Sequence, residues 1–227
     1  MHQFSKLALL IIAGVVSIPT LAPSQTPGFY KDIFSDGGTN LTHTTYMHAA
    51  EDLGLSVEYL CVSDSSVQNS VMIRSPEDSN GHLLYPDGAP RFRMIYTNGG
   101  QSTSHGLSLG EIGRERVRSF FSHGGSYSGS CAGAYLACEH YNPTGTNTAY
   151  YHIWPGRTEA TGLSNSYTGH NVMQNSPLLL YFDFGNDLYV DDVRHNGGCY
   201  ANEAVDVPPR TQILMRYDTP NRPAMNG

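Results

Sequence analysis

The sequence contains few charged residues, very little lysine and few cysteines. Only 15% of its 227 residues are Asp, Glu, Lys or Arg, and only two are Lys, whereas 39% are hydrophobic. Disordered chains, coiled coils and collagen-like repeats do not combine this apolar fraction with so few Lys and Glu, so the composition excludes these classes. The chain also lacks internal repeats and low-complexity tracts, and its length predicts one globular domain.

An excess of positive charge is also absent. The chain carries 13 Lys and Arg against 20 Asp and Glu, which gives a formal net charge of −7. Proteins that bind nucleic acid need basic residues to neutralise the phosphate backbone. Nucleic acid is therefore not an expected partner.

The sequence has a single long apolar run, Leu7–Ile18, and it lies near the N-terminus. At about 12 residues the run is shorter than the ~20 needed to span a bilayer, so an N-terminal membrane anchor is the weaker interpretation. Lys6 precedes it, and the small residues of Ala22-Pro23-Ser24 follow it. This pattern predicts a signal peptide over residues 1–24, a mature domain over 25–227, and a secreted or periplasmic protein without a membrane partner after cleavage.

The four cysteines are too few to replace a hydrophobic core with a disulfide framework. In an oxidising compartment they could form two disulfides with three possible connectivities, or one disulfide with two free thiols. If Cys131 stays free, the weakly favoured pair is Cys138 with Cys199. The four residues are Cys61, Cys131, Cys138 and Cys199.

Strand and helix signals alternate in the first two thirds of the chain. The predicted strands there are Phe29–Phe34, Val57–Val62 and Phe92–Tyr96. Helical spacing predicts one helix ending at Gly54 and another ending before Gly124-Gly125. Residues 63–90 are polar and irregular, with a turn at Pro86-Asp87-Gly88.

Repeated strand-helix units predict a parallel sheet covered by helices, with ligands beyond the carboxyl ends of its strands. Three later segments read as strands joined by turns, so antiparallel strands are expected towards the C-terminus. These segments are Leu178–Phe184, Leu188–Val193 and Gln212–Tyr217.

The segment Gly129-Ser130-Cys131-Ala132-Gly133 lies between a short predicted strand and a helix-forming stretch. A nucleophile at a sharp strand-to-helix turn adopts a strained backbone, and glycine is needed on both sides because side chains there would collide with neighbouring backbone. Free N–H groups at the start of the helix would favour the thiolate of Cys131. The alternative is that Cys131 is a small buried side chain or half of a disulfide.

Gly99 and Gly100 follow the predicted third strand, at the same edge of the sheet. Their backbone N–H groups, together with that of Ala132, could form an oxyanion hole beside Cys131. An ordinary tight turn is the other interpretation of the glycine pair.

These motifs resemble those of the class I glutamine amidotransferase-like superfamily. The similarity is strongest to the domain at the N-terminus of biotin–protein ligases, here as a stand-alone chain. The resemblance spans about Phe29 to Tyr217. Its motifs are Ser35-Asp36-Gly37-Gly38-Thr39, Tyr96-Thr97-Asn98-Gly99-Gly100, Gly124-Gly125-Ser126-Tyr127, Gly129-Ser130-Cys131-Ala132-Gly133-Ala134-Tyr135 and Arg194-His195-Asn196-Gly197-Gly198.

The resemblance implies an α/β, flavodoxin-like three-layer sandwich, a Cys131 nucleophile, and an oxyanion hole shared by the glycine loop and Ala132. It also implies His195 as the base. In the amidotransferases Pro and Glu follow this histidine, but Asn196 and Gly197 stand here. Asp191 and Glu203 are the possible substitutes for the missing carboxylate.

The ten histidines do not predict a metal site, and no cofactor is expected. His43 and His48 are five residues apart, and His140 and His152 are twelve apart, so neither pair has the i,i+4 spacing of a helical zinc site. His105 is expected in a solvated loop, with substrate contact as the alternative. His170 is the rival of His195 as base.

Three functions remain open. The favoured one is a secreted cysteine-dependent hydrolase that acts on an amide or acyl compound, small molecule or peptide. The second is a non-catalytic binding or scaffold protein on the same fold, which the loss of the carboxylate would explain. The third is a cysteine peptidase.

Overall fold

The computed structural model describes residues 28–36, 47–59, 81–141 and 145–219. The predicted signal peptide, Cys61, His43, the Gly37-Gly38-Thr39 part of the first motif and most of the 63–90 excursion lie outside these residues. In the described end of the excursion, Gly88 N–H donates to the carbonyl of Tyr85, which forms the expected turn, and Leu84 forms an antiparallel bridge with Pro90.

A four-stranded parallel sheet forms the centre of the N-terminal half. Its strand order is β2-β1-β3-β4, and every neighbouring pair is parallel. The strands are β1 (Lys31–Ser35), β2 (Val57–Tyr59), β3 (Phe92–Thr97) and β4 (Ser126–Gly129). β1 and β3 match the predicted strands Phe29–Phe34 and Phe92–Tyr96 to within two residues at each end. β2 begins at the predicted residue, Val57, and residues 60–62 of that prediction lie outside the described residues.

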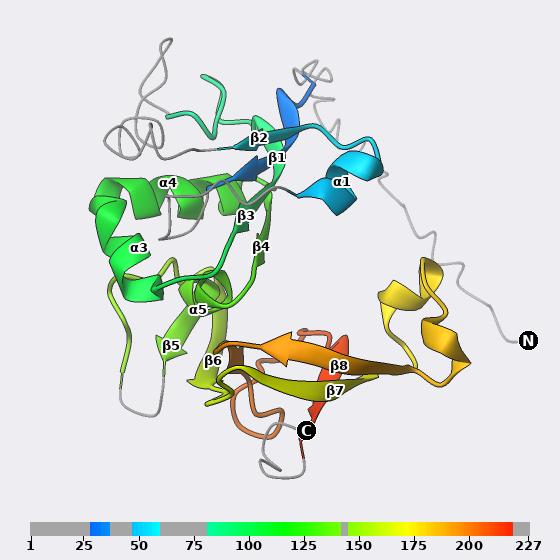
Figure 1. Ribbon diagram of the computed structural model, residues 1–227. Helices are drawn as coiled ribbons and strands as arrows, with labels where there is room; N and C mark the ends of the chain where they lie inside the picture. Colours follow the sequence, from blue (N-terminus) through cyan, green and yellow to red (C-terminus); the bar gives the residue numbers. More distant parts are fainter. Residues whose placement is uncertain (1–27, 37–46, 60–80, 142–144, 220–227) are drawn as a thin grey trace, which may run out of the picture.

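Helices cover this sheet, with α3 and α4 on one side in Figure 1 and α1 on the other. The helices are α1 (His48–Asp52), α3 (Ser102–Ser108), α4 (Gly110–Ser122) and α5 (Ala132–Ala137). Val117 and Phe120 of α4 are buried against Phe34 and Ile95 of the sheet. Gly54 has a φ of +80° and donates its N–H to Glu51 at the end of α1, as its predicted C-terminal role requires.

The predicted α/β, flavodoxin-like class is confirmed, and the C-terminal strands form sheets of their own. One sheet is antiparallel in the order β10-β7-β8, and the other has the order β5-β6-β9 (Figure 1). Their strands are β5 (Cys138–Tyr141), β6 (Trp154–Ala160), β7 (Ser166–Val172), β8 (Tyr189–His195), β9 (Cys199–Tyr200) and β10 (Met215–Asp218).

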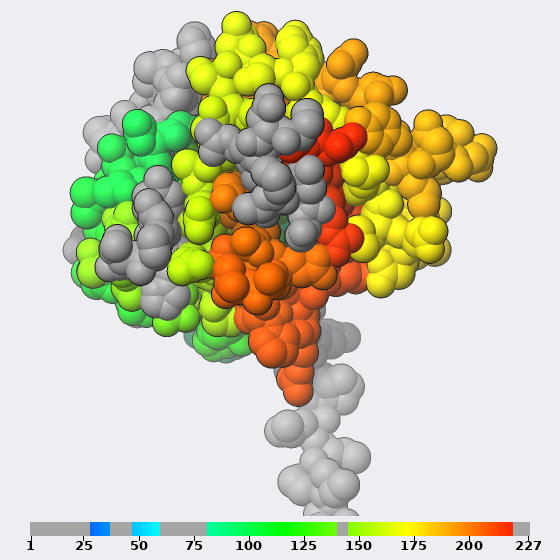
Figure 2. Space-filling model, turned by 90° about the horizontal axis from the view of Figure 1, so that it is seen from below, coloured from blue at the N-terminus to red at the C-terminus, as the bar shows by residue number. Residues whose placement is uncertain are grey.

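The prediction of a strand over Leu178–Phe184 is wrong. The segment forms two 3₁₀ turns, η2 (Pro177–Leu180) and η3 (Phe184–Asn186), which project from the body in Figures 1 and 2. Ser176 caps the first turn by accepting the N–H of Leu178, and Asp183 caps the second by accepting that of Gly185. These side-chain caps compete with strand formation in a sequence whose apolar run alone favours a strand.

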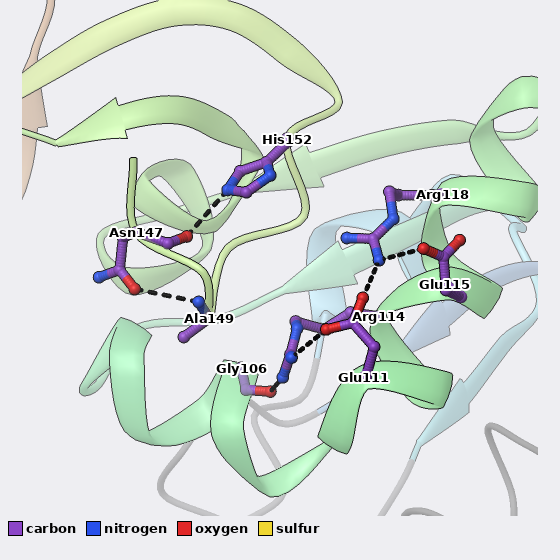
Figure 3. A network of polar contacts seen from close by, with 8 residues as sticks. All are labelled: Gly106, Glu111, Arg114, Glu115, Arg118, Asn147, Ala149 and His152. Carbon is purple, nitrogen blue, oxygen red and sulfur yellow. Dashed lines mark hydrogen bonds and ion pairs between the residues drawn. The ribbon is translucent and has the colours of Figure 1, made fainter. Parts of the chain in front are cut away.

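A polar network joins α3 to α4 (Figure 3). The buried guanidinium of Arg114 donates to the carbonyl of Gly106 at 2.6 Å and to Glu111 at 2.5 Å. In the neighbouring loop, the side chain of Asn147 accepts the N–H of Ala149 at 3.0 Å. A Cβ on Gly106 would lie 1.8 Å from the carbonyl oxygen of Ala149, so the helix and loop meet only because residue 106 is glycine.

Within the described ranges, no helix is both long enough and apolar enough to cross a membrane.

Candidate active site

Cys131 lies at the turn between β4 and α5 with φ of +51° and ψ of −108°. This conformation is strained for a residue with a side chain, and such strain is concentrated at functional sites. The turn is held by hydrogen bonds on both sides of Cys131. Ser130 N–H donates to the carbonyl of Thr97 at 3.0 Å, and Ala134 N–H donates to the carbonyl of Cys131 at 3.1 Å.

The two glycines that flank the turn are sterically required. A Cβ on Gly129 would lie 2.4 Å from the carbonyl carbon of Gly133, and one on Gly133 would lie 2.2 Å from the carbonyl oxygen of Thr97. These contacts match the collisions expected from the sequence. The backbone at Cys131 is therefore the strand-to-helix elbow that the glycine spacing predicts.

The Gly99-Gly100 loop lies directly beside the sulfur. A Cβ built on Gly99 would be 3.7 Å from Cys131 Sγ, so the missing side chain leaves space at this atom. The N–H groups of Gly99, Gly100 and Ala132 have no acceptor in the described part of the chain. Within the described residues these three N–H groups are therefore available to a ligand, and the Gly99 position lies next to the sulfur.

Side chains of Tyr96 and Ser130 connect the glycine loop to the elbow. The two hydroxyl groups are 3.0 Å apart, and Ser130 also donates to the side chain of Asn98 at 3.4 Å. Both bonds join residues more than thirty positions apart in sequence. They fix the loop donors relative to Cys131 before any ligand binds.

Cys131 and His195 line the same pocket, which has a volume of about 350 Å³. His195 reaches it from the end of β8, and Gly197, Gly198 and Cys199 complete the wall on that side. The structure thus brings together Cys131 and His195, two of the side chains expected in the site. No hydrogen bond joins these two described side chains, so a direct proton transfer requires the thiol and the imidazole to move within hydrogen-bond reach of one another.

His195 packs against aromatic rings in place of a carboxylate. Its ring centroid is 5.2 Å from that of His170 on β7 and 5.4 Å from that of Tyr217 on β10. Burial lowers the pKa of His195 below its ordinary value of 6.5. The pKa of His170 is also lowered, first by burial and then by the neighbouring His195. Both imidazoles are therefore neutral at neutral pH, the form that accepts a proton.

Neither substitute carboxylate contacts His195. Glu203 pairs with Arg216, and β8 has a bulge that places Asp191 and Asp192 opposite the single residue Gly169. Asp192 has a φ of +51° there. In an unbroken strand, alternation would place Asp191 on the same face as His195, but the bulge shifts the alternation by one residue.

His105 is not a solvated loop residue, contrary to expectation. It lies in α3, is 1% exposed, and its Nε2 is 3.1 Å from a carboxylate oxygen of Asp36, which Thr97 also contacts at 2.7 Å. This buried network links the ends of β1 and β3 directly behind the elbow. The contact between Asp36 and His105 could not be predicted from the sequence, because the two residues are 69 positions apart.

Cys131, Cys138 and Cys199 are all free thiols, so the favoured Cys138–Cys199 disulfide is not formed. The Cys138 thiol lies 3.3 Å from the carbonyl of Ala134 and 3.4 Å from the hydroxyl of Thr158, which satisfies it without a bridge. Burial raises the pKa of Cys138 to about 11 and also raises that of Cys199. These two thiols are held in the protonated form.

Tyr135 is a positioning residue that sequence reasoning did not single out. It lies on α5, four residues after Cys131, and its hydroxyl donates to the carbonyl of Gly198 at 2.7 Å. Gly198 in turn accepts the N–H of Thr161 at 3.0 Å. The loop that carries His195 is therefore tied to the helix that follows Cys131.

Among the described residues, no group of three or more His, Cys, Asp or Glu side chains could hold a metal ion.

No family model matches the sequence. An uncharacterized protein of Chlamydia muridarum (strain MoPn / Nigg) is 28% identical over 141 residues, which cover 58% of this chain and 52% of that protein. The chain therefore spans about half the length of this relative.

A solved structure described as "Crystal structure of glutamine amidotransferase" is similar with a TM-score of 0.48 and 14% identity. The similarity covers 81% of this chain and 79% of that one. A similarity of this size carries no information about activity, so the chemistry of the site rests on its own geometry.

Proposed function

We propose that the protein is a cysteine-dependent hydrolase that acts on an amide or related acyl compound. The observation that carries this proposal is the strained elbow, where the thiol of Cys131 opens into a pocket shared with the neutral imidazole of His195. A nucleophile, a base and backbone N–H donors for the oxyanion are the components that acyl transfer requires.

In the proposed reaction, His195 accepts the proton of the Cys131 thiol while the sulfur attacks the carbonyl carbon. The N–H groups of Gly99, Gly100 and Ala132 bind the resulting oxyanion. The proton then passes from His195 to the leaving amine as the C–N bond breaks and a thioester forms. Water hydrolyses the thioester, with His195 as general base for the water, and the thiol is restored.

No carboxylate of the described residues contacts His195, and we expect this to affect the rate rather than the route. The ring is oriented by its contacts with His170 and Tyr217 and by the anchored loop that follows it. Proton transfer by a positioned base typically contributes about 10²–10⁴-fold. We therefore expect a slow hydrolase compared with enzymes that retain a full triad.

The proposed setting is extracytoplasmic, after removal of residues 1–24. The supporting observation is the apolar run with its small-residue cleavage site. Sequencing the N-terminus of protein purified from the medium or periplasm tests this: Gln25 is expected as the first residue, and an intact Met1 would contradict it.

Hydrolysis of p-nitrophenyl acetate tests the chemistry directly. We expect a burst of p-nitrophenolate close to one per protein molecule, and one acetyl group on the peptide that contains Cys131. Cys131→Ala should abolish both, while the matched variant Cys138→Ala, at a thiol outside the pocket lining, should keep the acetylated peptide.

A protein without a burst and without acetylation of Cys131 would favour the non-catalytic alternative. The observations behind that alternative are the missing carboxylate at His195 and the missing Cys131–His195 hydrogen bond in the described structure. Acetylation spread over Cys138, Cys199 and surface groups would have the same meaning.

A further inference from the structure

A second pocket adjoins the Cys131 pocket, and aromatic and aliphatic side chains form most of its wall. Its volume is about 340 Å³, and its lining includes Trp154, Leu178, Val207, Ile213, Met215 and Tyr217. These residues come from β6, η2 and the C-terminal segment that ends in β10. In Figure 2 the orange-to-red C-terminal residues lie beside the yellow and gold residues from this part of the chain. We call this site the apolar pocket.

The indole ring of Trp154 is built into its wall. A Cβ on Gly156 would lie 2.1 Å from the ring, so the indole lies flat over this glycine two residues further along β6. The indole N–H donates to the hydroxyl of Thr211 at 3.1 Å. Because the indole N–H is already hydrogen-bonded to Thr211, the ring offers a ligand in the pocket its hydrocarbon surface.

The polar side chains in the lining are also paired with protein groups. Glu203 pairs with Arg216, and the hydroxyl of Tyr200 donates to Glu159 at 3.1 Å. The hydroxyl of Tyr217 donates to the carbonyl of Cys199, also at 3.1 Å. These pairs reduce the polar capacity that the lining offers to a ligand, whereas an apolar ligand would gain from burial.

Tyr217 connects this site to Cys131. It lines both pockets, and its ring centroid is 5.4 Å from that of His195. A substrate that has its carbonyl at Cys131 and a side chain in the apolar pocket would therefore pass Tyr217. The volume of the apolar pocket is at the lower end of the range for small-ligand sites, which suits one aromatic or branched aliphatic side chain.

We propose that the apolar pocket is the specificity pocket of the enzyme and that the substrate is an amide carrying an aromatic or branched aliphatic side chain. This inference rests on the proposed hydrolase function for its catalytic meaning. Binding of the side chain itself does not need a working nucleophile, so the two proposals can fail separately.

Trp154 is the only tryptophan in the chain, and its fluorescence therefore reports directly on the pocket. The experiment titrates the Cys131→Ala protein with N-acetyl-L-phenylalaninamide, and with N-acetyl-L-glutaminamide for comparison. We expect a saturable change in fluorescence with the phenylalanine compound and binding at least about tenfold weaker with the glutamine compound, because even one methylene group in a hydrophobic pocket changes binding by about 10–200-fold.

A matched pair of variants locates the binding. Ala201 lines the apolar pocket, whereas Ala204 is exposed three residues further on. Ala201→Leu should weaken binding of the phenylalanine compound by about tenfold or more because it fills the pocket, and Ala204→Leu should leave it unchanged. The comparison of the two compounds in Cys131→Ala, in which the apolar pocket is unsubstituted, does not need Ala201→Leu, so the test remains valid if Ala201→Leu does not fold.

Equal responses to the two compounds, no response to either, or full binding by Ala201→Leu would overturn the inference. If Trp154 responds as expected but p-nitrophenyl acetate gives no burst, the pocket stands as a binding site and the hydrolase proposal fails. If the burst occurs and Trp154 does not respond, only the specificity proposal is lost.

Discussion

At the scale of single residues, burial gives His195 the properties of a base at neutral pH. The ring is enclosed by His170 from β7 and Tyr217 from β10, and the Cys131 pocket lies on its open side. Desolvation disfavours the imidazolium and lowers its pKa below 6.5. The proposed mechanism uses the neutral form, which this environment favours.

The pH dependence of the p-nitrophenyl acetate burst tests this role. The rate should rise with pH as His195 loses its proton, and the midpoint of this acid limb should lie below 6.5. In His195→Ala the limb should disappear and the rate should fall by about 10²-fold or more. A midpoint above 6.5, or an unchanged limb in this variant, would assign the proton transfer to another group, with His170→Ala as the first comparison.

Gly133 and Gly99 make a second residue-scale prediction. Gly133→Ala forces a Cβ to 2.2 Å from a backbone oxygen, and it should lower the free energy of unfolding by about 1–3 kcal/mol, measured by urea denaturation. Gly99→Ala makes ordinary contacts of 3.4 and 3.7 Å with Cys131, so it should fold normally but crowd the sulfur and slow the burst. Equal stability of Gly133→Ala and the unsubstituted protein would mean that the elbow is packed differently.

At the scale of elements, the site depends on links between segments that are distant in sequence. The buried bond from Thr97 to Asp36 joins β3 to the end of β1, and Tyr135 joins α5 to the loop after β8. Each link ends within a few residues of the proposed catalytic groups. Local stability and geometry of the site are therefore coupled.

Loss of the Thr97 hydroxyl should expose this coupling. Thr97→Val removes a buried donor to Asp36 and leaves the carboxylate with one partner fewer. We expect a loss of about 1–3 kcal/mol in the free energy of unfolding, whereas Thr97→Ser keeps the hydroxyl and most of the stability. Thermal unfolding of the two variants side by side makes the comparison, and a Val variant as stable as the Ser variant would show that the bond contributes nothing.

Sequence patterns predicted the elements whose signal is local. The parallel strands, the helix end at Gly54 and the elbow all follow from apolar periodicity or from glycines that a turn requires. The segment over Leu178–Phe184 misled the prediction because side-chain caps decide its conformation. The bulge in β8 could not be predicted either, because the residue types at Asp191 and Asp192 do not indicate an extra residue in the strand.

The contacts that complete the site could not be predicted, because they depend on how elements pack. The pairs Asp36 with His105 and Tyr135 with Gly198 are both separated by more than sixty residues. His195 was found from a resemblance to a family motif, and the structure adds that His170 and Tyr217 pack on it. These three residues are neighbours because their strands lie side by side in the order β10-β7-β8 in one sheet.

At the scale of the whole molecule, the fold makes three chemically identical thiols different. Cys131 and Cys199 both line the pocket, but burial raises the pKa of the Cys199 thiol and also that of Cys138, which is not in the lining. Only thiolates react with alkylating reagents, so the buried pair should be slow. In the unfolded chain this difference vanishes, and the reactivity of each cysteine becomes similar.

Timed alkylation with iodoacetamide at about pH 7, followed by mass mapping of the cysteine peptides, tests the central claim most directly. For the folded protein, the account predicts that Cys131 is labelled roughly tenfold or more faster than Cys138 and Cys199, and that the three rates converge in denaturant. Slow labelling of Cys131 in the folded protein, or its recovery in a disulfide, would contradict the account.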